Sequence, residues 1–179
     1  MRNDEIKARL LTFHFPRWDE LPNFDIYMDQ VVFYINDHLG VLNIAETDKE
    51  ITASMVNNYV KNSIVKAPIR KHYKNYHLAF LIIVTILKRA YSLNEISKMI
   101  NIQRMMKNND LQLAYDTFAT YFETVLHETV KNGYYLSKES DPYRRLLLNI
   151  TQSVVLKIYA QIELKNPIFD KEKDIVKEG

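Results

Sequence analysis

The segment from residue 51 to residue 80, ITASMVNNYVKNSIVKAPIRKHYKNYHLAF, contains no acidic residue and carries side chains suited to contact with a nucleic acid. Ser54, Asn57, Asn58 and Lys61 are spaced so that a helix would place them on one face. An asparagine can bond an adenine edge at two points, and a lysine can reach guanine or a phosphate. We therefore expect these four residues to contact the bases of duplex DNA.

A cluster of cations follows that helix in the sequence VKAPIRKHYKN. Pro68 disfavours a helix there, so the cations should lie on a short extended turn that resembles a wing and grips the DNA backbone. A tyrosine hydroxyl could add a hydrogen bond to phosphate, and the residue that begins the helix could add another. The expected phosphate contacts are Thr52, Lys66, Arg70, Lys71, Tyr73 and Lys74.

The helix that positions the amides begins after Thr52, a good N-cap, and should run to about Asn62. At 100° per residue, Met55, Val56, Tyr59 and Val60 fall on its other side, which we expect to dock on the core. Residues 76–89 should form a buried helix. Ser92 should cap a further helix over LNEISKMI.

This order of elements resembles the winged helix-turn-helix of the MerR-type transcription regulators. The matching pieces are Thr52, Tyr59, SIVKAP, RKHY and AYSLNEI, within residues 18–100. Within that class the chain is similar to a group of YkrK-like bacterial proteins of unknown function, through LPNFDIYMDQV, TASMVNNYVK and PIRKHY. The resemblance implies a MerR-like fold with a small β-hairpin wing around residues 68–73, and a function in DNA binding. Related sensors bind their signal through cysteines, and this chain has none, so the sensing function does not carry over.

The charge distribution also favours a polyanionic partner. Residues 51–109 contain ten basic residues and one acid, Glu95, although the whole chain has a net charge of only +2. The first and last thirds are both acidic, so the molecule is polarised. The absence of cysteine excludes disulfides and thiolate metal sites. The longest apolar run, residues 78–87, is half the length of a membrane span of about 20 residues, and we expect a buried helix there and a cytoplasmic protein.

The sequence gives little support for an enzymatic function. HETVK, residues 127–131, has a lysine where a zinc protease needs its second histidine. His72 and His77 could chelate a metal, but no third ligand is evident, and Asp25 with Asp29 is better explained as an acidic surface. We expect no catalytic residues, no metal and no cofactor.

The expected fold class is mainly α, with a DNA-binding domain over residues 1–107 and a helical region over residues 108–179. Two long helices should fill the second region, one from about Asp110 to Lys131 and one from Asp141-Pro142 to about Leu164. Their apolar stripes suggest a homodimer, and an unknown small-molecule or protein effector could bind there. Two alternatives stay open: a helical protein–protein adaptor that does not bind DNA and, less favoured, a binder of single strands or RNA.

Overall fold

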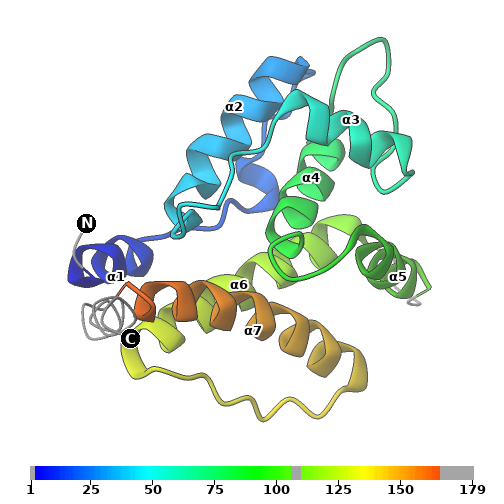
Figure 1. The fold of residues 1–179 in the computed structure, drawn as a ribbon. Helices are drawn as coiled ribbons and strands as arrows, with labels where there is room; N and C mark the ends of the chain where they lie inside the picture. Colours follow the sequence, from blue (N-terminus) through cyan, green and yellow to red (C-terminus); the bar gives the residue numbers. More distant parts are fainter. Residues whose placement is uncertain (1–2, 106–109, 166–179) are drawn as a thin grey trace, which may run out of the picture.

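The computed structural model describes residues 3–105 and 110–165, and these residues fold into α-helices and short 3-10 turns (Figure 1). The expected boundary between two domains, after residue 107, lies outside the described residues. The elements in chain order are α1 (Asn3–Leu11), η1 (Trp18–Glu20), α2 (Met28–Leu39), η2 (Gly40–Leu42), α3 (Ala53–Lys61), α4 (Asn75–Leu87), α5 (Leu93–Arg104), α6 (Leu111–Asn132) and α7 (Pro142–Glu163).

Helix ends match the caps that the sequence contains. The Thr52 hydroxyl accepts a hydrogen bond from the Met55 amide at the start of α3, and Ser92 does the same for Glu95 in α5. Asp110 begins α6 in this way, and Asp141 begins α7, with Pro142 in its first turn. Each expected start is therefore confirmed.

Helix α4 runs through the middle of the molecule, and the expected buried helix is confirmed. Its side chains at Leu78, Leu81, Ile82, Val84 and Ile86 have no exposed surface. A helix that is apolar on all sides must be surrounded by other elements. Figure 1 shows α4 between the α2–α3 part and the α5–α7 part of the fold.

Helices α6 and α7 lie side by side, and the loop between them runs back along their length (Figure 1). The loop is attached to both helices, because the Gln152 side chain donates to the Tyr135 carbonyl and the Tyr121 hydroxyl donates to Glu139. Helix α1 packs on the same pair. The N-terminal helix thus belongs structurally with the C-terminal helices, and its apolar partners are far from it in sequence.

The expected β-hairpin wing is wrong, because residues 3–105 and 110–165 contain no β-strand, only isolated bridges. Ile69 and His72 exchange both backbone hydrogen bonds and close a two-residue turn. The next rung of a hairpin would join the Ala67 carbonyl to the Lys74 amide. Instead, the Lys74 amide donates to Nδ1 of His77 at 2.9 Å, and Nε2 of the same ring contacts the Ala67 carbonyl oxygen at 3.3 Å. A histidine ring therefore takes the place of the second rung, and the ladder stops after one pair.

Candidate nucleic-acid interface

Helix α3 presents one polar face to solvent because its other face is held by the core. Val56 and Tyr59 are buried, and Met55 and Val60 are partly buried against the same core. The segment that enters the helix is fixed by Asn36 of α2, whose side chain accepts from the Ile51 amide and donates to the Ile51 carbonyl. The orientation of α3 is therefore set by the hydrogen bonds of Ile51, just before the helix, and by the buried side chains of Val56 and Tyr59 within it.

The four residues expected to contact bases are all exposed. Ser54, Asn57, Asn58 and Lys61 lie on the solvent side of α3. The Asn62 amide donates to the Asn58 side-chain oxygen at 3.0 Å and to the Asn58 carbonyl at 2.8 Å. This arrangement leaves the amide NH₂ of Asn58 free to donate, and its oxygen keeps a second lone pair. The helical spacing already places Asn62 on this face, and the structure shows that its side chain bonds to Asn58, four residues earlier.

The chain leaves α3 through a left-handed residue. Ser63 has φ 57°, the Ile64 amide donates to the Tyr59 carbonyl at 3.0 Å, and the Ser63 amide donates to the Val60 carbonyl at 2.9 Å. These two bonds form a Schellman motif, which usually places glycine where Ser63 stands. The motif turns the backbone sharply, and buried Ile64 and Val65 then fix the start of the following segment.

We name residues 66–74 the basic turn. Its four cations, Lys66, Arg70, Lys71 and Lys74, are all exposed. Arg70 and Lys71 form the tip and both have positive φ, 52° and 68°. Both central residues of a type I′ turn adopt such values, and glycine or asparagine is usual there. Two cations thus stand side by side at the end of a tight turn.

The base of the basic turn is anchored to the core. Tyr73 and Ile26 exchange backbone hydrogen bonds at 2.8 and 3.0 Å, and both side chains are buried. His72 packs on Tyr27, with ring centroids 4.6 Å apart. Tyr73 is only 2% exposed, so the expectation that it contacts a phosphate was wrong. The Thr52 hydroxyl is at the surface but caps α3.

Burial changes the titration of the histidine that closes the turn. His77 has no exposed surface, and burial lowers its pKa, to which the nearby Lys66 and Lys74 add. A lowered pKa fits its contacts, because Nδ1 must be unprotonated to accept from the Lys74 amide. Beneath α3, burial raises the pKa of Tyr59.

The cations of the interface have no acidic partner in the described part of the chain. The ion pairs there involve other basic groups: His14, Arg17, His38 and Arg89. Lys61 and the cations of the basic turn are thus available to an external anion. An array of unpaired exposed cations next to short amides suits a phosphate backbone with base edges beside it.

The sequence features considered for catalysis have structural roles. His127 contacts the Phe13 carbonyl at 3.0 Å, which holds the N-terminal loop on α6. His77 bonds within the basic turn, and His72 packs on Tyr27, so the two do not converge on one point. Among residues 3–105 and 110–165, no group of three or more potential metal ligands comes together. Within the same residues, no helix is both long and apolar enough to cross a membrane.

Comparison with known proteins gives one family. A family model described as a domain of unknown function (DUF1836) matches residues 16–133, which include α3 and the whole basic turn. No curated protein and no solved structure matches the chain. The expected family was therefore wrong. The match is to this domain, whereas the expected family was that of the MerR-type regulators, with the YkrK-like proteins as the nearest group. The hairpin wing of the MerR-like fold is also missing from the described residues.

Proposed function

The chain belongs to the DUF1836 family, and we propose that it is a cytoplasmic protein that binds duplex DNA sequence-specifically and regulates transcription. The observation that carries the proposal is the exposed polar face of α3 followed directly by the unpaired cations of the basic turn. In this proposal Ser54, Asn57, Asn58 and Lys61 contact bases. Phosphates are contacted by Thr52, Lys66, Arg70, Lys71 and Lys74.

The dimensions of α3 support a groove-binding role. Nine residues make a helix of about 14 Å, and the major groove of DNA is about 12 Å wide. The exposed face carries short amides that can approach base edges closely, and it has no acidic residue. Lys61, in the last turn, is placed to reach a phosphate or a guanine.

We also propose that the protein acts as a homodimer. One helix of this length reads few base pairs, and proteins that insert a helix into the major groove commonly pair two half-sites by two-fold symmetry. Light scattering at tens of micromolar should give twice the monomer mass. A mass that stays at that of the monomer contradicts this part of the proposal and leaves DNA binding to be judged separately.

DNA binding is tested by titrating labelled duplexes, selected from a random pool, at several salt concentrations. Asn58→Ala should weaken binding to the preferred site by about 1–3 kcal/mol and relax the choice of base at one position. Arg70→Ala should weaken all sequences alike and reduce the salt slope by about one unit. The two effects differ because one contact reads a base and the other reads only charge.

Lys131→Ala is the matched control, since it removes an exposed cation at the end of α6, outside the proposed interface. It should bind every duplex as the parent does. If the parent binds no duplex at low salt, or if Asn58→Ala and Arg70→Ala both equal the control, the basic turn is only a charged surface.

That outcome would favour a second function, a helical adaptor that binds another protein. The observation in its favour is the exposure of large apolar side chains on the C-terminal helices. Leu113 is 59% exposed and Leu146 is 41% exposed. Apolar groups grouped at a surface are typical of interaction sites.

A further inference from the structure

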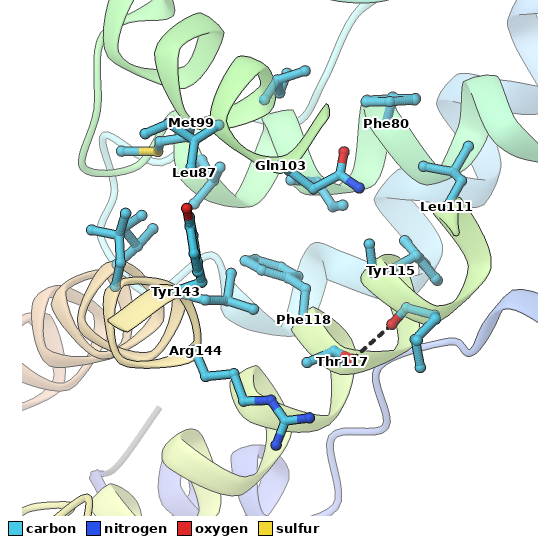
Figure 2. Close-up of a pocket in the computed structure, with 18 of the residues that line it drawn as sticks. Phe80, Leu87, Met99, Gln103, Leu111, Tyr115, Thr117, Phe118, Tyr143 and Arg144 are labelled. Carbon is cyan, nitrogen blue, oxygen red and sulfur yellow. Dashed lines mark hydrogen bonds between the residues drawn. The ribbon is translucent and has the colours of Figure 1, made fainter. Parts of the chain in front are cut away.

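A cavity of about 370 Å³ lies between the helices that follow the basic turn and the C-terminal pair. Figure 2 shows its walls: Phe80 and Leu87 from α4, Met99 and Gln103 from α5, Leu111 and Phe118 from α6, and Tyr143 from α7. The cavity therefore joins the part of the chain that carries the candidate interface to the helices at the far end of the sequence. Its volume lies in the range of natural small-molecule sites, about 300–1,000 Å³.

The walls are mostly apolar, and the polar residues among them are few: Gln103, Asp110, Thr117, Tyr143 and Arg144. The Thr117 hydroxyl donates to the Leu113 carbonyl, as the dashed line in Figure 2 marks. Asp110 caps the first turn of α6, where the helix N-terminus balances its charge. An occupant would therefore need a largely hydrocarbon body, because a polar one would lose its water without gaining partners.

One end of the cavity opens toward cations. A second, more open pocket shares Phe80, Gln103 and Leu111 with the cavity and is also lined by Lys66 and Arg104. In Figure 2 the three shared residues gather at one end, opposite Tyr143. The Arg104 guanidinium lies over the Phe80 ring, 6.0 Å from its centre. Neither Lys66 nor Arg104 has an ion pair within the part of the chain that the structure describes.

We propose that this cavity binds a free amphipathic carboxylate, with its hydrocarbon body between α4, α5, α6 and α7 and its carboxylate toward Arg104 and Lys66. The body would contact apolar side chains from four helices. The carboxylate would lie where the shared wall leads to the two cations, near enough to the surface to stay partly hydrated. Two cations, Lys66 and Arg104, thus lie beyond the wall that the two pockets share, while Arg144 lines the cavity away from that wall and the remaining lining is largely apolar.

Lys66 gives the site a consequence that rests on the proposed function. The same side chain is expected to contact a phosphate of DNA. A bound carboxylate would compete for that cation and weaken DNA binding. Because α6 and α7 also line the cavity, such a ligand would be the small-molecule effector that the sequence led us to expect at the C-terminal helices.

Calorimetry with decanoate, below its micelle concentration and without DNA, tests the site itself. The parent should bind decanoate, and Arg104→Gln should weaken that binding about tenfold, as expected for one charge-assisted contact near the surface. Binding of decanol, which has no charge, should be equal in the two proteins. Ala114→Phe fills the cavity from α6 and should abolish binding of both ligands. Ala160→Phe adds the same ring at an exposed position of α7 away from the cavity and should bind as the parent does.

No binding of decanoate by the parent overturns the proposal, as does equal decanoate affinity in the parent and Arg104→Gln. Binding that survives in Ala114→Phe, checked to be folded by circular dichroism, overturns the location. Sedimentation with anionic phospholipid vesicles separates a free ligand from a membrane lipid: binding to vesicles without binding of decanoate rejects the free carboxylate. In the duplex titration, decanoate should lower the affinity of the parent, and an unchanged affinity refutes the coupling but not the site.

Discussion

His77 is a single side chain on which the shape of the basic turn depends. Its neutral ring accepts from the Lys74 amide and reaches the Ala67 carbonyl, and burial lowers its pKa. In the unfolded chain the ring takes up a proton near pH 6.5. Below that pH the unfolded state binds more protons than the folded state, so stability should fall as the pH drops through about 6.5 and stop falling below the folded pKa.

Urea unfolding of the parent at pH 8 and pH 5.5, compared with His77→Gln, measures this effect. The variant should lose less stability on acidification, although it is less stable than the parent at pH 8. Ring resonances followed by NMR give an independent reading in the folded parent. Titration of His77 at or above its ordinary pKa would contradict the prediction.

The sequence could predict whether a side chain is exposed or buried where that follows from a local helical pattern. The 100° spacing of α3 separates Asn57 and Asn58 from Val56 and Tyr59, and the structure exposes and buries them accordingly. Tyr73 and His77 could not be placed in this way. Tyr73 is buried because its backbone pairs with Ile26, and His77 closes the turn through a carbonyl ten residues earlier. Neither partner is visible in a helical or alternating pattern.

At the scale of elements, helix starts were predictable because a cap acts within three residues of itself. Ser92 and Glu95 bond one another across the first turn of α5, and both are present in the sequence as a capping box. By contrast, the absence of a β-hairpin at residues 68–73 could not be predicted from local sequence signals. Whether a two-residue turn extends into strands depends on which groups take the next backbone donor and acceptor, and here a histidine side chain takes both.

The end of α3 allows a prediction about its left-handed residue. Ser63 has φ 57°, where a Cβ costs about 1–2 kcal/mol that glycine avoids, partly offset by the greater freedom of unfolded glycine. Ser63→Gly should raise the free energy of unfolding by about 0.5–1 kcal/mol, measured by urea denaturation. Gly133→Ala is the opposite change at the end of α6, where φ is 83°. An added Cβ there meets only the Tyr159 hydroxyl at 4.0 Å, so its cost, about 1 kcal/mol, is conformational. Gly133→Ala is expected to lower the free energy of unfolding. If Ser63→Gly lowers it as well, the argument is contradicted.

At the scale of the whole molecule, the first and last parts of the sequence form one structure. The Phe15 amide donates to Glu123 and the Trp18 amide donates to Asp116, so the N-terminal loop is attached to α6. Phe15 also packs edge-on against Tyr115, Phe118 and Phe122 of that helix. The sequence predicted the helices of the last part but not this packing, because contacts between distant segments leave no periodic signal. Helix α1 and the loop after it thus share a body with the acidic last third, and the basic third carries α3 and the basic turn.

The connector between α2 and α3 is held to the rest of the molecule by Asp48. One carboxylate oxygen accepts from the Ile44 and Ala45 amides at 2.9 Å, and the same oxygen lies 3.6 Å from the Arg89 guanidinium. Arg89 in turn donates to the Leu42 carbonyl at 3.0 Å, and burial lowers its pKa while Asp48 opposes that effect. Both side chains are less than one fifth exposed, 16% for Asp48 and 13% for Arg89.

Removing Asp48 should therefore leave a buried cation and two backbone amides without their partner. We expect Asp48→Ala to lower the free energy of unfolding by about 3 kcal/mol. Asp48→Asn keeps an oxygen for the two amides and loses only the charge, so it should cost about half as much. Asp37→Ala, at an exposed position of α2, is the control and should change the free energy of unfolding by less than about 0.5 kcal/mol. Urea denaturation followed by circular dichroism measures all three. Equal stability of Asp48→Ala and the control would mean that the connector is held by its apolar contacts alone, through Leu42 and Ile44 in the core.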